Sequence, residues 1–177
     1  MRTLRASVTP REVLTGLHMT GTTDDSYREP TMSHEQVEKH FRDRQRAWVR
    51  HDAETLARGH AEHGILRTPM FGVVRGREHI GATYRLLFRA FSGQQFRFDP
   101  MVIDGHRVAL PMMASVIHTT EFLGLAPTGQ RAEIEGIFID ELSPDGLIVS
   151  EHRIYDFTRA LVQLGALPGG REGPLHV

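Results

Sequence analysis

The chain has 177 residues, 40% of them hydrophobic, which is typical of a single globular domain with its own core. Twenty-one Lys and Arg residues stand against 22 Asp and Glu residues, and the resulting charge of -1 argues against nucleic acid or an anionic membrane as partner. Cysteine is absent, which excludes disulfides and thiolate chemistry, and because neither a membrane-spanning run nor a signal-peptide pattern is seen, we expect a cytoplasmic protein.

The first predicted helix follows a segment without hydrophobic periodicity. Residues 1–31 show no sustained period and predict a flexible arm. Ser33 with Gln36 forms a capping-box pattern, and the helix is predicted over residues 33–50. Its apolar stripe is Val37, Phe41, Ala47 and Trp48. The run of Arg42, Arg44, Arg46 and Arg50 is interleaved with acidic residues and is interpreted as a solvated helix face.

Two more helices and a hairpin are predicted next. Asp52 is expected to cap a short helix that ends at Gly64. The apolar residues 65–74, broken by a proline and a glycine, predict a bent hairpin. A third helix then runs to Gly93, and its apolar stripe is Ile80, Tyr84, Leu87, Phe88 and Phe91.

Beyond residue 94 the hydrophobic period changes from 3.6 to 2, which predicts strands. Four strands are expected, at residues 95–103, 107–122, 131–142 and 147–155. A last helix over 157–164 ends at Gly165, and residues 169–177 form a tail. Three helices followed by a curved, mostly antiparallel sheet define an α+β class for the domain at 32–168.

Several segments resemble a known family. They are "HAEHGILRTPMFGVVRGREHIGATYRLLFRAF" (60–91), "HTTEFLGLAPTGQR" (118–131), "EGIFIDELSPDGLIVSE" (135–151) and "DFTRALVQLG" (156–165). The chain resembles the SnoaL-like polyketide cyclase family of the nuclear transport factor 2-like (NTF2-like) superfamily over residues 33–167. The resemblance implies a cone-shaped α+β barrel with a pocket for a small hydrophobic molecule. Members include cyclases, ketosteroid isomerases, epoxide hydrolases, dehydratases and proteins without known catalysis, so the fold alone selects no reaction.

The catalytic pair that the resemblance implies is not found at its matching positions. Cyclases of the family carry an acid/base Asp in the last strand and a His on the preceding strand. Arg153 or Ile154 stands where the Asp is expected, and the His position falls near Phe138. The aldol-cyclase mechanism is therefore not transferred to this chain.

The last strand nevertheless offers two candidate catalytic residues, His152 and Asp156. They share strand parity, so they are expected on one face, where a His with a carboxylate partner is able to abstract a proton. Asp156 is also the expected N-cap of the last helix, and this reading is favoured. Glu151, Arg153 and Tyr155 have the opposite parity and are expected to form an outer ladder, although a one-residue bulge would exchange the two faces.

His118 and Tyr84 are the other two catalytic candidates. His118 ends a strand that is apolar on both faces, and is read as a pocket base or as a hydrogen-bonded strand-end histidine. One face of that strand is expected to pack against a second subunit, which predicts a homodimer.

The Tyr84 hydroxyl is a candidate donor to a substrate carbonyl. The next strand carries carboxylates of both parities, and the sequence does not decide which of them points inward. They are Glu133, Glu135, Asp140 and Glu141.

The predicted pocket lining consists of aromatic and Met side chains: Trp48, Met70, Phe88, Phe91, Met112 and Phe138. "HAEH" places His60 and His63 at a spacing that brings two imidazoles together on a helix, but zinc needs a third ligand, so no metal is expected. The sequence thus favours a cofactor-independent enzyme that acts on an apolar carbonyl compound by acid/base cyclisation, isomerisation or hydration. The rival hypothesis is a small-molecule carrier of the same fold.

Overall fold

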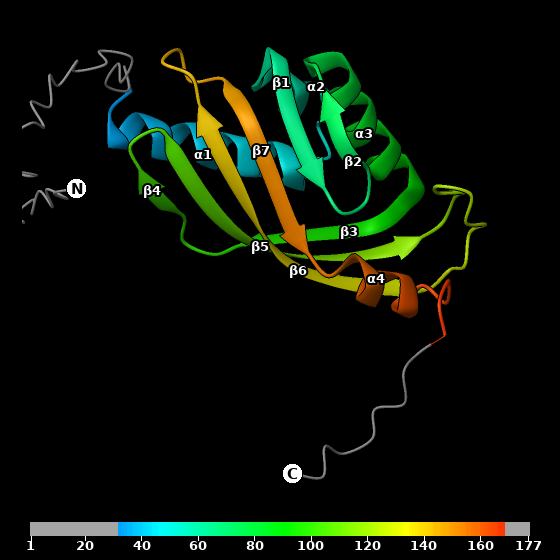
Figure 1. Ribbon diagram of the computed structural model, residues 1–177. Coiled ribbons are helices and arrows are strands. Elements are labelled where there is room, and N and C mark those ends of the chain that lie inside the picture. Colours follow the sequence, from blue (N-terminus) through cyan, green and yellow to red (C-terminus); the bar gives the residue numbers. More distant parts are fainter. Residues whose placement is uncertain (1–31, 169–177) are drawn as a thin grey trace, which may run out of the picture.

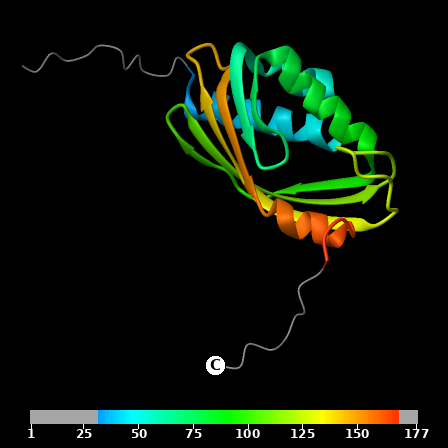
Figure 2. The same ribbon diagram turned by 45° about the vertical axis from the view of Figure 1, so that its right-hand side comes forward.

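Three helices lie against the concave face of a strongly curved sheet (Figures 1 and 2). The structure is a computed structural model that describes residues 32–168; the predicted arm and tail lie outside the described residues. The helices are α1 (His34–Val49), α2 (Ala53–Arg58) and α3 (Arg77–Ala90), and a short α4 (Phe157–Gln163) follows the last strand. No helix in the described range is long and apolar enough to cross a membrane.

The sheet has seven strands and does not close on itself. In chain order they are β1 (His60–Thr68), β2 (Gly72–Arg75), β3 (Phe91–Phe98), β4 (Val102–Asp104), β5 (Arg107–His118), β6 (Arg131–Leu142) and β7 (Ile148–Tyr155). Their spatial order is β2-β1-β7-β6-β5-β3, and β4 pairs with β5. All pairs are antiparallel except β1 with β7. The predicted α+β class, with a curved sheet and a C-terminal helix, is confirmed.

The helix starts are correctly predicted because their caps are local. Ser33 accepts a hydrogen bond from the backbone N–H of Gln36, whose side chain accepts one from the Ser33 backbone in return. Asp52 accepts from the N–H of Thr55 at the start of α2. Each cap satisfies backbone donors that have no partner inside the helix, so a few residues define these boundaries.

Several predicted ends are wrong. The second helix ends at Arg58 rather than Gly64, and residues from His60 onward pair as β1. The third helix ends at Ala90, so Phe91 begins β3 instead of continuing the helical stripe. The strand predicted at 95–103 is divided between β3 and β4, and the strand predicted at 107–122 stops at His118. At the two helix ends, pairing with a neighbouring strand overrides the local pattern: His60 pairs with Ile148, and Phe91 pairs with His118.

Bulges in β7 and β3 decide which side chains of these two strands face the helices. Between the pairs Leu142↔Ile148 and Glu141↔Ser150, β6 advances by one residue while β7 advances by two. The extra residue in β7 reverses the side-chain alternation, so Glu151 and Arg153 are buried and His152 is exposed. The predicted outer ladder of Glu151, Arg153 and Tyr155 is therefore wrong: these residues face inward. The second bulge, in β3, is described with the pocket below.

Gly136 is required where β6 and β7 approach most closely. A Cβ at this position would lie 2.5 Å from the Ile154 carbonyl oxygen and 2.8 Å from the Cβ of Tyr155. Both neighbours belong to β7 and are directly paired with β6, so the strands would have to separate locally.

We expect Gly136→Ala to destabilise the fold by about 1–3 kcal/mol, because the added methyl group meets backbone atoms that cannot rotate away. Urea denaturation followed by circular dichroism measures this change. The matched control is Ser115→Ala on β5, which removes atoms instead of adding them. An unchanged denaturation midpoint for Gly136→Ala would show that the two strands separate without cost.

Candidate functional site

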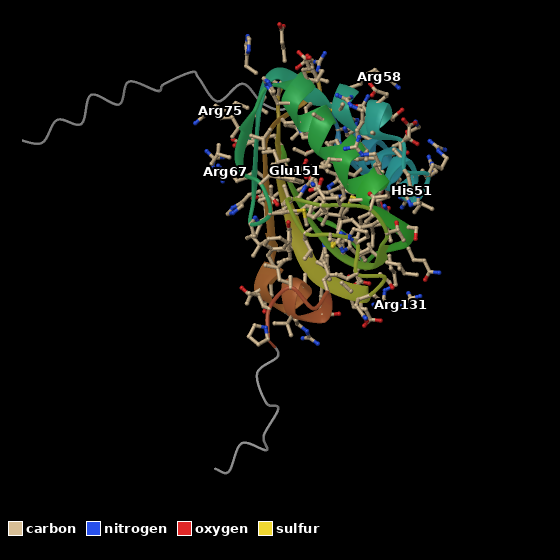
Figure 3. All side chains as sticks on the ribbon, turned by 90° about the vertical axis from the view of Figure 1, so that its right-hand side faces the viewer. His51, Arg58, Arg67, Arg75, Arg131 and Glu151 are labelled. Atoms are coloured by element: carbon tan, nitrogen blue, oxygen red, sulfur yellow. The ribbon has the colours of Figure 1, made fainter. Side chains whose placement is uncertain are left out.

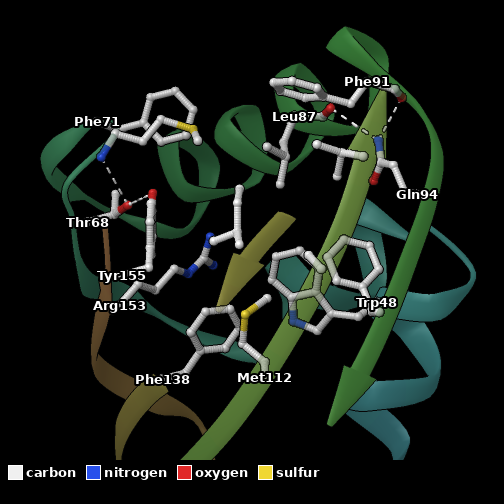
Figure 4. Close-up of a pocket in the computed structure, with 15 residues that line it drawn as sticks. Trp48, Thr68, Phe71, Leu87, Phe91, Gln94, Met112, Phe138, Arg153 and Tyr155 are labelled. Carbon is white, nitrogen blue, oxygen red and sulfur yellow. Dashed lines mark hydrogen bonds between the residues drawn. The ribbon is translucent and has the colours of Figure 1, made fainter. Parts of the chain in front are cut away.

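An apolar pocket lies between the concave face of the sheet and the helices (Figure 4). It encloses about 60 Å³. Of the predicted lining residues, Trp48, Met70, Phe91, Met112 and Phe138 line it, whereas Phe88 packs behind Trp48 with ring centroids 5.6 Å apart. The other lining residues are Thr68, Phe71, Leu87, Gln94, Phe96, Ala114, Val116, Ile134, Arg153 and Tyr155.

Polar groups enter this pocket from two sides. From β1 and β7, Thr68 and Tyr155 share a 2.8 Å hydrogen bond between their hydroxyl groups, and the Arg153 guanidinium lies next to them (Figure 4). From β3, Gln94 reaches the pocket at the end of α3. The indole Nε1 of Trp48 is buried and has no hydrogen-bond partner within the described residues.

Arg153 is the charged group of the pocket, and it is held rigidly from behind. Its Nε donates to Glu151 Oε1 at 2.5 Å, and its Nη2 donates to the Tyr84 hydroxyl at 2.7 Å. Its guanidinium carbon lies 5.1 Å from the ring centroid of Trp48, 4.9 Å from that of Tyr84 and 5.0 Å from that of Phe138. Three aromatic faces and one carboxylate therefore fix the cation in a site with little water.

A second arginine completes the buried cluster. Arg44 of α1 donates to the second Glu151 oxygen at 2.8 Å and to the Tyr84 hydroxyl at 2.7 Å. The Nε2 of His60 lies 3.1 Å from Arg44 Nη2 and 3.0 Å from the Tyr84 hydroxyl. The cluster thus joins α1, α3, β1 and β7. Figure 3 shows Glu151 in the interior, while Arg58, Arg67 and Arg131 project at the surface.

The buried environment shifts the protonation of the cluster. Burial alone would raise the pKa of Glu151, but the guanidinium groups of Arg153 and Arg44 lower it well below its usual value. Burial raises the pKa of Tyr84 to about 12, and burial lowers the pKa of His60. At neutral pH the cluster therefore holds two cationic arginines, one carboxylate, a neutral tyrosine and a neutral histidine.

Asp140 is a second buried carboxyl group, and it is not paired. It is 1% exposed, lies directly opposite Glu151 on β6, and neither of its oxygens has a hydrogen-bond partner among the described residues. Burial and the neighbouring Glu151 charge raise the pKa of Asp140 well above its usual value, although Arg44 and Arg153 act in the opposite direction. This shift disfavours the charged form of Asp140, so Glu151 is the main counter-charge of the two arginines.

The four catalytic candidates do not come together in one site. Tyr84 is at the centre of the buried cluster. His118 is fully buried at the end of β5, where its Nδ1 lies 3.3 Å from the hydroxyl of Thr128, and it does not line the pocket. His152 is exposed on the outer face of the sheet, and Asp156 caps α4 by accepting from the N–H of Arg159. The structure does not bring His152 and Asp156 into the pocket.

The cluster residues Arg44, His60, Glu151 and Arg153 were not predicted as a site. The interpretation of Arg44 as part of a solvated face is wrong, since it is 5% exposed. Its position carried a signal: Val37, Phe41, Arg44 and Trp48 fall at intervals of four, three and four residues, which places the arginine on the buried stripe. No comparable signal reveals the bulge that turns Glu151 and Arg153 inward.

"HAEH" lies on β1 and not on a helix, so the expected helical spacing of its two histidines is wrong. His60 is buried in the cluster, whereas His63 is exposed. Within residues 32–168 no three His, Asp or Glu side chains are grouped as metal ligands.

On the opposite face of β5, alternate residues such as Met113 and Ile117 are partly exposed, and the homodimer expected there remains a prediction.

Comparison with solved structures shows an NTF2-like fold. AclR from Streptomyces galilaeus superposes with a TM-score of 0.67 at 23% identity, covering 77% of this chain and 100% of AclR. IdmH from Streptomyces antibioticus gives a TM-score of 0.61 at 26% identity, with 73% and 99% covered. SalBIII, an epoxide hydrolase/cyclase-like enzyme in pyran ring formation in salinomycin, gives 0.59 at 19% identity, with 71% and 94% covered.

The sequence itself identifies the family. The profile described as SnoaL-like polyketide cyclase matches residues 38–164, which is more than half of the chain. The chain therefore belongs to the SnoaL-like polyketide cyclase family, as its motifs indicated. No curated protein shows a significant match.

The two buried carboxyl groups are expected to respond oppositely to neutralisation. Glu151→Gln leaves two buried arginines without their counter-charge and should cost about 3–5 kcal/mol of stability at pH 7. Asp140→Asn removes an unpaired acid and should leave stability unchanged or raise it. The matched control is Glu135→Gln, which changes an exposed carboxylate on β6.

The pH dependence tests the same assignment. Because the folded-state pKa of Asp140 is raised, its contribution to stability is present below its usual pKa of 3.8 and is lost as the pH rises through the folded value. Asp140→Asn should abolish this loss, so its advantage over wild type should grow with pH in urea denaturation. Identical pH slopes for the two proteins would contradict a protonated Asp140.

Proposed function

We propose that this protein is an acid/base enzyme that binds an apolar, carbonyl-bearing small molecule in the Arg153 pocket and promotes its cyclisation, isomerisation or hydration. The observation that carries the proposal is the position of Arg153: its guanidinium lines a mostly apolar pocket and is fixed from behind by Glu151 and Tyr84. Membership of the SnoaL-like family supports a small enzyme of this general type.

Arg153 would act by stabilising negative charge on oxygen. A carbonyl oxygen beside the guanidinium accepts hydrogen bonds, and these bonds strengthen when negative charge develops on that oxygen as water or a hydroxyl group of the same ligand adds to the carbonyl carbon. The donor is already oriented by its own partners, so little reorganisation is needed at the moment of reaction. The apolar rings around the cation exclude water and increase this electrostatic effect.

Tyr155 would relay the proton: its hydroxyl protonates the carbonyl oxygen and takes up the proton that the added water or hydroxyl group loses. Burial raises the pKa of its hydroxyl, which keeps the phenol protonated, and the hydroxyl lies beside Arg153 at the same end of the pocket. Together with the Arg153 guanidinium, it offers the ligand two donors at this end. It therefore suits a molecule that presents oxygen acceptors here.

The ligand must displace side chains to enter. About 60 Å³ is far below the volume of most small-molecule sites, roughly 300–1,000 Å³. A neighbouring apolar cavity of about 200 Å³, bordered by α4, shares Met70, Phe91, Val116 and Ile134 with the pocket. Rotation of the flexible Met70 side chain would join the two spaces.

A non-catalytic binding protein is the second candidate, and one observation favours it. The described pocket lining includes neither a carboxylate nor a histidine that would accept a proton from a ligand. Such a protein would use the same Arg153 contact only to hold and orient its ligand.

A panel of polyketide-like ketones, steroid enones and terpenoid epoxides tests the proposal, with binding followed by differential scanning fluorimetry and conversion by mass spectrometry. For a converted compound, Arg153→Lys should lower kcat/KM by about 100-fold and Tyr155→Phe by about 10-fold or more. Arg89→Lys, a change of an exposed arginine on α3, is the matched control.

Two other outcomes would replace the proposal. Binding without any conversion, sensitive to Arg153→Lys, would identify the protein as a carrier. Conversion that survives Arg153→Lys but is lost in His152→Ala or Asp156→Asn would assign the chemistry to the residues predicted from the sequence and place it outside this pocket.

A further inference from the structure

The amide of Gln94 is held in one orientation. Its Nε2 donates to the backbone carbonyl of Phe91 at 2.7 Å and lies 3.3 Å from the carbonyls of Leu87 and Phe88. Rotating the amide by half a turn would place its oxygen against these three carbonyl oxygens, which is electrostatically unfavourable. The side-chain nitrogen of Gln94 therefore points toward these carbonyl groups at the end of α3, and the side-chain oxygen points away from them.

A bulge turns this side chain inward. Between the pairs Ser92↔Ile117 and Gln95↔Ser115, β3 advances by three residues while β5 advances by two. Gly93 has φ of 55° in the same stretch, a conformation that favours glycine. Because the alternation shifts here, Gln94 is 9% exposed and lines the pocket, while Gln95 is exposed to solvent.

The oxygen that results is a buried acceptor without a partner. The Oε1 of Gln94 is inaccessible and receives no hydrogen bond from any of residues 32–168. The rest of the nearby lining is apolar, with Leu87, Phe91 and Val116 among its members. A ligand that brings an O–H group to this point would satisfy the acceptor, whereas a ligand with hydrogen or a methyl ether there would bury it unpaired.

The acceptor and the donors lie at different parts of the pocket. Gln94 comes from β3, whereas Arg153 and Tyr155 come from β7, and β5 and β6 lie between these strands. Three strand spacings amount to roughly 14 Å along the sheet, and its curvature shortens the direct path. Figure 4 likewise shows Gln94 and Arg153 on opposite sides of the pocket.

We propose that Gln94 determines specificity by accepting a hydrogen bond from a ligand hydroxyl group. This proposal rests on the proposed function, in which Arg153 and Tyr155 receive an oxygen acceptor of the same ligand. The ligand class is thereby narrowed to rigid, apolar molecules that carry a carbonyl oxygen at one end and a phenol or alcohol at the other.

Two matched probes test this specificity. The first is 6-hydroxy-2-acetonaphthone, which has both groups on a rigid bicyclic ring, and the second is 2-acetonaphthone, which lacks the hydroxyl. Wild type should bind the hydroxylated probe at least about 10-fold more tightly in isothermal titration calorimetry, because the second probe leaves Gln94 Oε1 unpaired.

Gln94→Met should reduce that ratio to about 1 by removing the acceptor at similar volume. Gln95→Met, a change of the exposed neighbour, should leave the ratio as in wild type. Binding of 2-acetonaphthone by Gln94→Met shows that the variant is folded, and the wild-type ratio decides the question even where the variant is unstable.

The possible failures are distinguishable. If wild type binds both naphthones equally, or if Gln94→Met keeps the wild-type ratio, the role of Gln94 is overturned while the Arg153 pocket stands. If neither probe binds, the pocket is not a site for apolar carbonyl compounds, and both proposals fall.

Discussion

The interaction on which the rest of the structure depends is the carboxylate of Glu151 between two buried arginines. Arg153 occupies one oxygen and Arg44 the other, with Tyr84 accepting from both guanidinium groups. An ion buried without such partners would cost several kcal/mol, so the four elements that supply the cluster are constrained to meet at this point. The same contacts hold Arg153 at the edge of the pocket.

The charge balance of this cluster gives the pocket its electrostatic character. Glu151 neutralises one of the two arginines, whereas burial and the neighbouring Glu151 charge raise the pKa of Asp140 well above its usual value and disfavour its charged form. Arg44 is enclosed at the back, whereas Arg153 lines the cavity. The guanidinium of Arg153 is thus the positive charge on the side from which a ligand oxygen would approach.

Sequence reasoning succeeds here wherever the determining interactions are local. The capping box at Ser33, the Asp52 and Asp156 caps, and the apolar stripes of α1 and α3 all depend on neighbours within one or two helical turns. The family resemblance supplies the sheet, and the pocket-lining aromatic residues follow from that fold. The caps and stripes were predictable because each requires only a short window of sequence, whereas the sheet was predictable only through the resemblance.

The orientation of strand residues was not predictable, because a strand's alternation survives only as far as the next bulge. In β7 the extra residue lies between Ile148 and Ser150, and nothing in "IVSEHRIY" distinguishes it from a regular strand. If the alternation is continued through this extra residue, His152 is predicted to face the pocket and Arg153 the solvent, which is the reverse of what the structure shows. The register is set by pairing with β6, the preceding strand, and with β1, which lies far away in the sequence.

The two bulges also explain why an apolar cavity contains opposed polar groups. A regular β7 that continued the alternation from Ile148 would present His152 and Ile154 to the helices, and a regular β3 would present Gly93 and Gln95. Instead, the bulge in β7 directs Arg153, which is paired with Glu151, into the cavity. The bulge in β3 directs Gln94 inward, and its side-chain nitrogen is already bonded to the Phe91 carbonyl. In each case the group that enters the cavity is held from behind by protein atoms, so only one kind of hydrogen bond remains for a ligand to make. The pocket therefore has hydrogen-bond donors from β7 at one end and an acceptor from β3 at the other. A ligand that matches both is polar at its two ends, apolar between them, and binds in one orientation.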